Sequence, residues 1–584
     1  MAESATARET SGNVLFFMKI PVICTTLLIE KSPQALPLGA ACIATAIKHS
    51  SVTKDFCDVF LKTFCLEDSD FPKYREESSI YIADKLLEFL SAKAKSLKFE
   101  SAIFCFSVFV WNSIVLEAAA NILRKKGFVC IAGGPEITAH PSFYKEFDYT
   151  VSGEGELSVP NLIGNIISKN QNFSNENAFN NSKALDTVII SSAPDLSVIH
   201  SPYLDGIIDP AEYGGALWEL ARGCPFKCAY CYESKGEKTV RLFPMERIKA
   251  ELELFAKKNI PQVFVLDPTY NVNKKRAVEL LRLIASKTPN TFYYFEARAE
   301  LIDRELAREF TRIPCALQIG LQSANEETLR LVNRPFDKKK FIRGISILNE
   351  EGITFGLDLI FGLPGETFGS FRNGIDFAVS LYPNNLEIFC LSILPGTELF
   401  NRADFLEVIY DKAPPYHVIQ TKSFSTEDMK KAERLSKACS YFYNAGRAVP
   451  WFNSVCRVLK YKPSKLFEVF YNKYSEVCER DCTACDHASH EEIQKVQLEF
   501  LNLEFKERNL IRYYKAAEDI IKFYGAISRT TDTGKSEYVS LNYDAEYVAS
   551  DYASDICYFA EHLKPKKNRI QTFLNKGQVD FRNV

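Results

Sequence analysis

The stretch GALWELARGCPFKCAYCYE, residues 215–233, decides the fold of the second half of this chain. It opens as an apolar strand and closes as a loop that carries Cys224, Cys228 and Cys231 at the spacing C-x3-C-x2-C. Three thiolates in so compact a loop can bind one iron–sulfur cluster, whereas a complete 4Fe–4S cube normally takes four. One iron then keeps an open position, as catalytic metal sites do for their substrates. The alternatives are a zinc knuckle and three unrelated buried cysteines.

Five further strand candidates follow the cysteine loop, and helical patterns separate them. They are QVFVLDP, TFYYFEAR, CALQIGLQS, ITFGLDLIFGLPG and LEIFCLSILPG. Together with the strand before the loop they make six β/α units, the pattern of a parallel barrel or partial barrel over residues 213–411. Chemistry in such a barrel lies at the carboxyl ends of the strands, which is where the cysteines fall.

In these features the sequence resembles the radical S-adenosylmethionine (SAM) superfamily. The signature of that superfamily is three cysteines at this spacing after the first strand of a partial (β/α)6 barrel, with an aromatic residue, here Tyr230, before the third. The resemblance implies that the amino and carboxylate groups of SAM chelate the open iron. It also implies that one electron from the reduced cluster cleaves the sulfonium and releases a 5′-deoxyadenosyl radical, which abstracts hydrogen from a substrate.

The other strand ends resemble the segments with which this superfamily holds SAM. LDPTYN resembles the segment that meets the amino group, EAR and IGLQS resemble the ribose and carboxylate contacts, and GLDLIFGLPGET resembles the adenine motif. The implied SAM contacts are Tyr230, Asp267, Glu296, Arg298, Gln322, Ser323 and Gly362.

From residue 18 to residue 170, apolar strands alternate with helical patterns, beginning with a strand at Ile20–Leu28. Near-continuous apolar strands predict a parallel sheet that is covered on both faces, in a doubly wound, Rossmann-like fold. Such sheets bind ligands beyond the carboxyl ends of their strands, and several glycine turns fall there.

These turns, in the segments LPLG, SVFVWN, AGGPE and SGEGE, resemble the cobalamin-binding domain that precedes the barrel in one large radical SAM subclass. The resemblance implies cobalamin contacts at Ser107, Gly133, Gly134, Gly153, Glu154 and Gly155. The Asp-x-His-x-x-Gly motif that supplies a lower axial histidine elsewhere is missing, so we expect no protein histidine on cobalt, His140 included. A doubly wound domain that has lost its ligand is the alternative.

Residues 412–584 are expected to be mainly helical, and they contain a second C-x3-C-x2-C group. Cys478, Cys482 and Cys485 lie in the polar segment EVCERDCTACDH, whose charged residues predict that the thiols lie near solvent. Because exposed free thiols oxidise readily, this position favours a second metal site. The candidates are zinc with His487 or His490 as its fourth ligand, an auxiliary iron–sulfur cluster, and thiols without metal.

Length and composition limit the remaining possibilities. The 584 residues are 46% hydrophobic and 25% charged, which is typical of an ordinary globular protein with several domains. A net charge of −3 indicates no general attraction to nucleic acid or to an anionic membrane. No apolar run reaches the roughly 18 residues of a membrane span, and no secretory signal is visible. Seventeen cysteines without such a signal predict a reducing, cytoplasmic compartment, with thiols such as Cys105 and Cys130 in the core.

Two segments are expected to lie outside the domains: a disordered tail at residues 1–17 and a linker at residues 171–212, with one short strand at residues 187–190. Taken together, the motifs predict a cobalamin-dependent radical SAM enzyme with a 4Fe–4S cluster, SAM and cobalamin as cofactors. Methylation of an unactivated carbon is the favoured reaction, and rearrangement, cyclisation or ring contraction is the runner-up. A non-catalytic cofactor-binding or sensing protein is the hypothesis from another class. The expected partners are an unknown small-molecule or peptide substrate and an electron donor such as flavodoxin or ferredoxin.

Overall fold

The computed structural model describes residues 19–94, 102–170, 187–234, 239–479, 488–575 and 577–584. The tail predicted at residues 1–17 lies outside these ranges. The chain divides into two compact units, residues 1–217 with 243–260 and residues 218–242 with 261–584. Two parallel sheets and a mainly helical C-terminal region confirm the predicted fold class.

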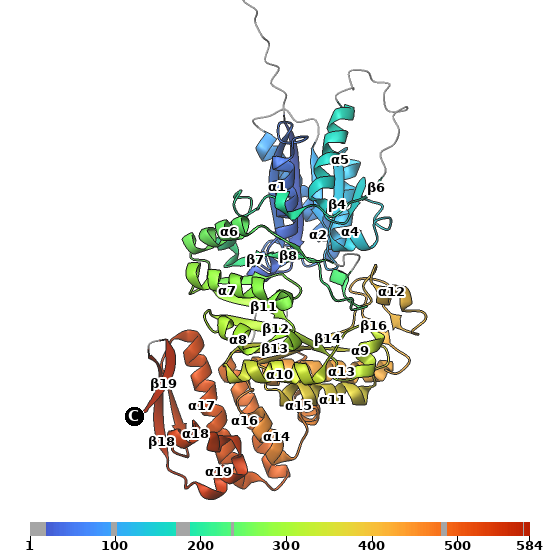
Figure 1. Ribbon diagram of the computed structural model, residues 1–584. Helices are drawn as coiled ribbons and strands as arrows, with labels where there is room; N and C mark the ends of the chain where they lie inside the picture. Colours follow the sequence, from blue (N-terminus) through green and yellow to red (C-terminus); the bar gives the residue numbers. More distant parts are fainter. Residues whose placement is uncertain (1–18, 95–101, 171–186, 235–238, 480–487, 576) are drawn as a thin grey trace, which may run out of the picture. The chain divides into compact units, whose positions relative to one another are not determined.

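The first unit is built on a six-stranded sheet of order β2-β1-β3-β4-β5-β6, in which all neighbours run parallel. Its strands are β1 (Ile20–Leu28), β2 (Cys57–Cys65), β3 (Ile103–Ser107), β4 (Val129–Gly133), β5 (Tyr149–Ser152) and β6 (Val188–Ile190). Helices α1 (Leu38–His49) and α5 (Gly155–Asn170) pack on one face, and α2 (Arg75–Ala94) and α3 (Ser113–Lys125) pack on the other (Figure 1). The strand expected within the linker is β6, and it completes this sheet by pairing with β5.

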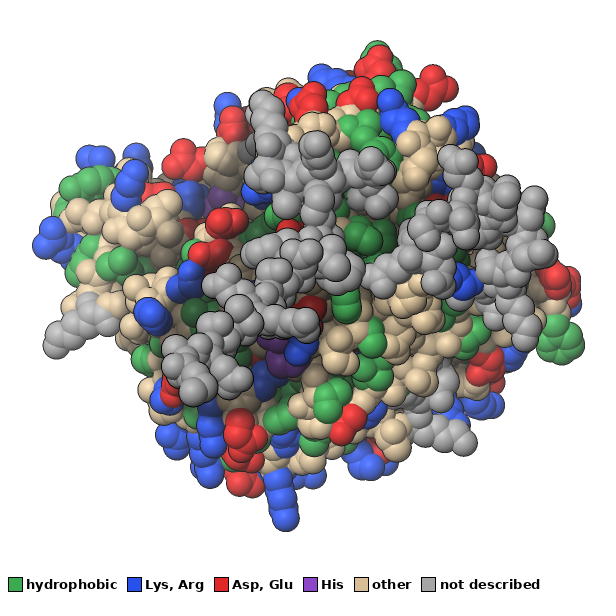
Figure 2. Space-filling model, turned by 90° about the horizontal axis from the view of Figure 1, so that it is seen from above, with side chains coloured by type: hydrophobic (Ala, Val, Ile, Leu, Met, Phe, Trp, Pro, Cys, Tyr) green, Lys and Arg blue, Asp and Glu red, His purple; other side chains and the backbone are tan. Residues whose placement is uncertain are grey.

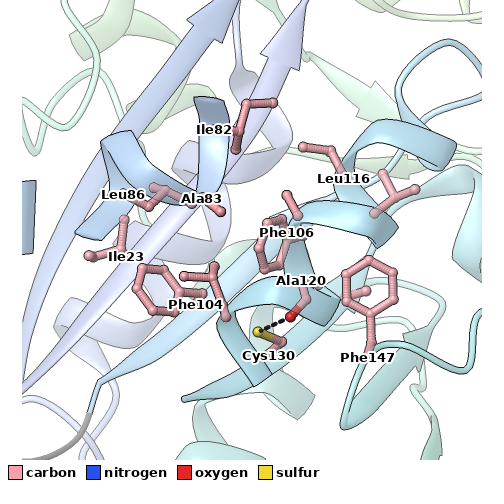
Figure 3. Close-up of a cluster of buried hydrophobic side chains, with 14 of the residues drawn as sticks. Ile23, Ile82, Ala83, Leu86, Phe104, Phe106, Leu116, Ala120, Cys130 and Phe147 are labelled. Carbon is pink, nitrogen blue, oxygen red and sulfur yellow. Dashed lines mark hydrogen bonds between the residues drawn. The ribbon is translucent and has the colours of Figure 1, made fainter. Parts of the chain in front are cut away.

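Alternation along β3 divides the buried residues between the two faces of this sheet. Phe104 and Phe106 belong to the cluster under α2 and α3 that Figure 3 shows, whereas Ile103 and Cys105 belong to the cluster under α1 and α5. The Cys130 thiol donates a hydrogen bond to the Ala120 carbonyl, with 3.6 Å between sulfur and oxygen. Burial raises the pKa of Cys130, so this thiol is a small core residue, as its apolar strand predicts.

A second six-stranded sheet has the order β14-β13-β12-β11-β10-β7. Its strands are β7 (Ala216–Trp218), β10 (Gln262–Val265), β11 (Phe292–Ala297), β12 (Cys315–Gln322), β13 (Thr354–Phe361) and β14 (Asn385–Cys390). All neighbours from β10 to β14 run parallel. Each strand predicted for the partial barrel is therefore present in the described chain.

The connecting helices cover the outer side of this second sheet. They are α7 (Lys274–Lys287), α8 (Arg304–Phe310), α9 (Glu326–Leu331), α10 (Lys338–Glu350) and α11 (Phe368–Ser380). Tyr293 and Phe295 of β11 are buried, and Phe295 packs edge-on against Phe310 of α8. The alternate residues of β11, Tyr294 and Glu296, therefore face the inner side of the sheet.

The C-terminal region is helical, as predicted, but it ends in an antiparallel sheet that sequence patterns did not reveal (Figure 1). Its helices include α13 (Thr426–Cys439), α14 (Phe452–Leu459), α15 (Pro463–Cys478), α16 (His490–Glu507) and α17 (Tyr514–Thr533), and its strands are β17 (Glu537–Leu541), β18 (Asn568–Asn575) and β19 (Gln578–Asn583). Only alternate residues of β17 and β18 are buried, such as Val539 and Leu541, and no residue of β19 is buried. The described contacts place α17 against one face of this sheet. Strands buried on one face carry polar residues on the other, so their sequence shows no continuous apolar run that would predict them.

The surface of the described chain carries charges of both signs. In Figure 2, Lys and Arg side chains are interspersed with Asp and Glu among apolar ones. This mixture accords with the small net charge of −3. Among the described helices, none is both long enough and apolar enough to cross a membrane.

Candidate active site

The cysteine loop begins and ends at a short antiparallel ladder. β8 (Ala221–Arg222) pairs with β9 (Arg241–Leu242), so the chain leaves and re-enters at neighbouring points. Gly223 opens the loop with a φ of +92°, and a Cβ there would lie 2.8 Å from the Thr239 carbonyl oxygen. Both the positive φ and this close approach require glycine before the first cysteine.

The segment between the second and third cysteines is held from two sides. The Ala229 N–H donates to the Val332 carbonyl at 2.8 Å, and the Ala229 carbonyl accepts from the Leu399 N–H at 2.7 Å. Within the loop, the Cys231 N–H donates to the Cys228 carbonyl at 3.0 Å. These backbone bonds fix the positions from which Cys228 and Cys231 project, before any metal is bound.

The three thiols lie in a partly desolvated environment. Cys228 is buried, and Cys224 and Cys231 are half-buried. Burial raises the pKa of Cys231 to about 11 and also raises the pKa of Cys224, although bonds from the Phe226 backbone and from Thr269 oppose this for Cys224. Among the described residues, no three His, Cys, Asp or Glu side chains are placed to hold a single metal ion. A cluster requires a wider arrangement, because each thiolate binds a different iron, and a three-cysteine loop fits that requirement.

Asp267 supports the entry to this loop. Its Oδ1 accepts the backbone N–H groups of Leu220 and Ala221, both at 2.9 Å. Burial raises the pKa of Asp267 to about 7, although these bonds oppose the rise. The carboxyl also lines a cavity of about 100 Å³ together with Gly223 and Arg276. Its predicted contact with the SAM amino group stays a prediction.

Arg298 lies directly behind the loop. Its guanidinium stacks 4.1 Å from the centre of the Phe226 ring and forms an ion pair with Glu300 at 2.9 Å. The Asn271 side-chain amide binds the Arg298 backbone twice: Nδ2 donates to the Arg298 carbonyl at 2.9 Å, and Oδ1 accepts from the Arg298 N–H at 3.0 Å. Nη1 of Arg298 is buried and has no hydrogen-bond partner in the described chain. This free donor is available to a ligand with acceptor oxygens, as the predicted SAM contact requires.

Carboxyl groups lie on the inner side of the sheet. Glu296 remains accessible to solvent, yet the surrounding protein and the charges of Asp358 and Glu233 raise its pKa to about 7. Burial raises the pKa of Asp358 to about 6, while a hydrogen bond from Gln318 opposes this. Both carboxyls therefore change protonation near neutral pH, where each can accept or donate a hydrogen bond.

The end of β12 is irregular at the predicted IGLQS contact. The register with β13 shifts between Gly320 and Gln322, and Gln322 has a φ of +70°. The Oε1 atom of Gln322 is buried without a partner in the described chain. Ser323, by contrast, donates to Glu366 at 2.6 Å and is fully used within the protein. Of the two predicted residues, Gln322 is the one whose polar group is left for a ligand.

Gly362 ends β13 with a φ of +86°. A Cβ there would lie 3.0 Å from the terminal methyl carbon of Met429, which belongs to α13. The positive φ by itself accounts for the glycine. The predicted contact of Gly362 with the adenine ring stays a prediction.

Arg334 is a site residue that sequence reasoning missed. Its Nη1 lies 3.9 Å from the Cys228 sulfur and 3.4 Å from the Tyr230 hydroxyl, and its Nη2 donates to the Gly320 carbonyl. It follows α9 in the segment LVNRP, where a single arginine gives no local signal. Only the fold reveals that this segment returns to the cysteine loop.

The residues predicted to contact cobalamin lie at the carboxyl ends of β3, β4 and β5 in the first unit. They are Ser107, Gly133, Gly134, Gly153, Glu154 and Gly155. A Cβ on Gly134 would lie 2.5 Å from the Val108 carbonyl oxygen, and one on Gly153 would lie 2.8 Å from that of Ser191. The close approach of the chain to itself therefore requires glycine at both positions, whether or not a ligand binds. Their location is where doubly wound sheets bind ligands, and the cobalamin contact stays a prediction.

The second cysteine group is only partly described. Cys482, Cys485 and His487 lie outside the described residues. Cys478 ends α15 and is 4% exposed, so the expectation that it lies near solvent is wrong: the helix turns this residue into the core although its neighbours in sequence are charged. His490 contacts Arg529 through Nδ1 at 3.2 Å and the Gly446 carbonyl through Nε2 at 3.4 Å, so both ring nitrogens are already engaged. A metal at this group stays a prediction.

Comparisons with known proteins agree with this geometry. Residues 218–378 match the family model described as the radical SAM superfamily, and residues 406–575 match one described as a protein of unknown function, DUF4080. The cobalamin-dependent radical SAM methyltransferase TokK of Streptomyces tokunonensis is 26% identical, over 51% of this chain and 48% of TokK. The 2-(S-pantetheinyl)-carbapenam-3-carboxylate methyltransferase of Streptantibioticus cattleyicolor is 25% identical with the same coverage, so the matches span about half the length of these relatives.

A solved structure extends the similarity of the fold. The cobalamin-dependent SAM radical enzyme OxsB, with aqua-cobalamin bound, superposes with a TM-score of 0.52 at 12% identity, over 88% of this chain and 81% of OxsB. A cysteine loop of this kind, after the first strand of a parallel sheet, defines a class of radical enzymes, and this chain is a radical SAM superfamily protein. More particularly, it resembles cobalamin-dependent radical SAM methyltransferases at a distance, which confirms the predicted resemblance. Membership implies a 4Fe–4S cluster and SAM.

Proposed function

We propose that this enzyme binds cobalamin and transfers a methyl group to an unactivated carbon of a small-molecule or peptide substrate. The observation that carries the proposal is the cysteine loop, whose backbone is held on both sides of Ala229 and supported at its entry by Asp267. The parallel sheet that precedes the loop in sequence and the relatives named as methyltransferases support the cobalamin and methyl-transfer parts.

The residues of the loop would hold three irons of the cluster through Cys224, Cys228 and Cys231. When bound, the cluster supplies the single electron that cleaves SAM. Because burial raises the pKa of Cys224 and Cys231, these thiols are protonated at neutral pH without iron, and cluster binding releases their protons. An electron donor such as flavodoxin or ferredoxin completes the proposed system.

The residues around the loop would orient SAM. Nη1 of Arg298 is a free buried donor and Oε1 of Gln322 is a free buried acceptor, and SAM offers a carboxylate and ribose hydroxyls. A buried group without a partner costs about 1–3 kcal/mol, so a ligand that satisfies both atoms gains affinity and a defined orientation. Glu296 and Asp358 supply further polar contacts on the inner side of the sheet.

The test of radical chemistry is reductive cleavage of SAM. We expect anaerobically reconstituted protein to show the absorption of a 4Fe–4S centre and, with dithionite, to release 5′-deoxyadenosine. Replacing Cys224, Cys228 and Cys231 together by Ala should abolish both signals. Cys390→Ala is the matched control, because that thiol is half-buried in β14 and lies outside the loop. Undiminished 5′-deoxyadenosine from the triple variant would refute the assignment of the loop.

The test of cobalamin chemistry uses SAM labelled in its methyl group. We expect cobalamin to remain bound through gel filtration and to acquire the label after reduction. The cob(II)alamin spectrum in electron paramagnetic resonance should lack nitrogen splitting, because no histidine is expected on cobalt. SAM cleavage with bound but unlabelled cobalamin would favour rearrangement or cyclisation instead. Bound cofactors without any cleavage would favour a sensing protein.

A further inference from the structure

Arg334 is a half-buried cation that lies against the cysteine loop. Nη1 contacts the Cys228 sulfur at 3.9 Å and the Tyr230 hydroxyl at 3.4 Å, and Nη2 donates to the Gly320 carbonyl. The Nε atom is buried and has no partner in the part of the chain that the structure describes. The guanidinium therefore approaches a cluster ligand directly through Nη1.

Arg334 has no carboxylate of its own. None lies within ion-pair distance of it among the described residues. Of the two carboxyl groups that interact with its charge from farther away, Glu300 is already paired with Arg298 at 2.9 Å and Asp358 accepts a hydrogen bond from Gln318. An arginine stays charged at any ordinary pH, and a charge that is partly withdrawn from solvent is stabilised by a counter-ion. The Cys228 thiol, whose sulfur lies 3.9 Å from Nη1, becomes an anion when it binds iron.

We propose that Arg334 is the counter-ion of the cluster at Cys228 and that it raises the reduction potential of that cluster. This inference rests on the proposed function, because it requires a cluster in the loop. An oxidised 4Fe–4S core of charge +2 with three thiolates has a net charge of −1, and gaining one electron from a one-electron donor makes it −2. A fixed positive charge beside one thiolate stabilises the more negative, reduced form. Net charge and hydrogen bonds to sulfur are among the factors that set such potentials.

The variants separate the charge of Arg334 from its shape. R334Q keeps hydrogen-bond donors but removes the charge, and R334K keeps the charge but loses the planar fork. R330Q is the matched control, because Arg330 lies on the same segment and is exposed. The full-length protein is reconstituted anaerobically without SAM, and its midpoint potential is measured by paramagnetic resonance during titration with dithionite and mediators.

We expect R334Q to have a more negative midpoint potential than wild type, by at least the tenfold change in reduced-to-oxidised ratio that equals about 59 mV for one electron. R330Q and R334K should stay near the wild-type value. A potential of R334Q equal to that of R330Q would overturn the inference, and weaker SAM binding by calorimetry in the same variant would then assign the guanidinium to the SAM carboxylate. If R334Q retains no cluster, R334K decides: a retained cluster with a wild-type potential supports the charge, and a lost cluster refutes it. Wild-type protein that builds no cluster contradicts the proposed function instead.

Discussion

The Ser323–Glu366 pair gives a prediction whose size follows from the structure. Glu366 is 1% exposed, its Oε1 accepts from Ser323 at 2.6 Å, and its Oε2 has no partner in the described chain. Burial raises the pKa of Glu366 from 4.5 to about 8, so the folded protein keeps this carboxyl protonated over a range in which the unfolded chain has lost the proton. Replacing Glu366 by Gln supplies a permanently neutral group of the same shape that still accepts from Ser323.

The sign and size of the effect follow from proton linkage. Between about pH 4.5 and pH 8 the folded state binds one more proton than the unfolded state, so the wild-type free energy of unfolding falls as pH rises. The interval is roughly three and a half pKa units, and at about 1.4 kcal/mol per unit the full shift corresponds to about 5 kcal/mol. Relaxation of the site reduces this figure, so we expect Glu366→Gln to gain at least about 2 kcal/mol over wild type on going from about pH 5 to pH 8.

Urea denaturation followed by circular dichroism measures this difference at several pH values. The matched control is Glu327→Gln, because that carboxylate lies at the start of the nearby helix α9 and is exposed. We expect the control to follow wild type at every pH. A difference between Glu366→Gln and wild type that does not change with pH would show that Glu366 titrates normally and would refute the reasoning.

The remaining predictions concern the cysteine loop and its surroundings. Gly223→Ala should lower the iron content of reconstituted protein at least severalfold, because the added Cβ meets the Thr239 carbonyl; iron equal to wild type would contradict the strain argument. Asp267→Ala should lose the cluster, and its free energy of unfolding should fall by about 1–3 kcal/mol for each backbone N–H group left without an acceptor. Asp267→Asn keeps an acceptor oxygen and should retain the cluster. Equal behaviour of the two variants would show that these backbone hydrogen bonds do not support the loop. If the second cysteine group binds metal, the variant without the three loop cysteines should still carry about four irons or one zinc per chain. A variant that carries neither iron nor zinc would refute the second metal site.

Part of the candidate site could be predicted because it is local in sequence. The three cysteines lie within eight residues, and the chemistry of a thiol loop after a strand depends only on that segment. The glycine before the first cysteine and the polar residues at strand ends follow from the same local logic. The order of β/α units also gave the partial barrel, since parallel strands need crossover helices.

Only the tertiary structure decided which distant segments contact one another. Arg334 reaches Cys228 across 106 positions, and Ser323 reaches Glu366 across 43, and neither pairing has a signature in the sequence. The environment of Cys478 shows the same limit, because a charged neighbourhood in sequence did not prevent burial at the end of α15. Burial and charge balance are properties of the packed chain, and they depend on which segments meet. The sequence by itself thus determined the kind of chemistry, a three-thiolate loop on a parallel sheet, whereas the fold decided which charges surround it.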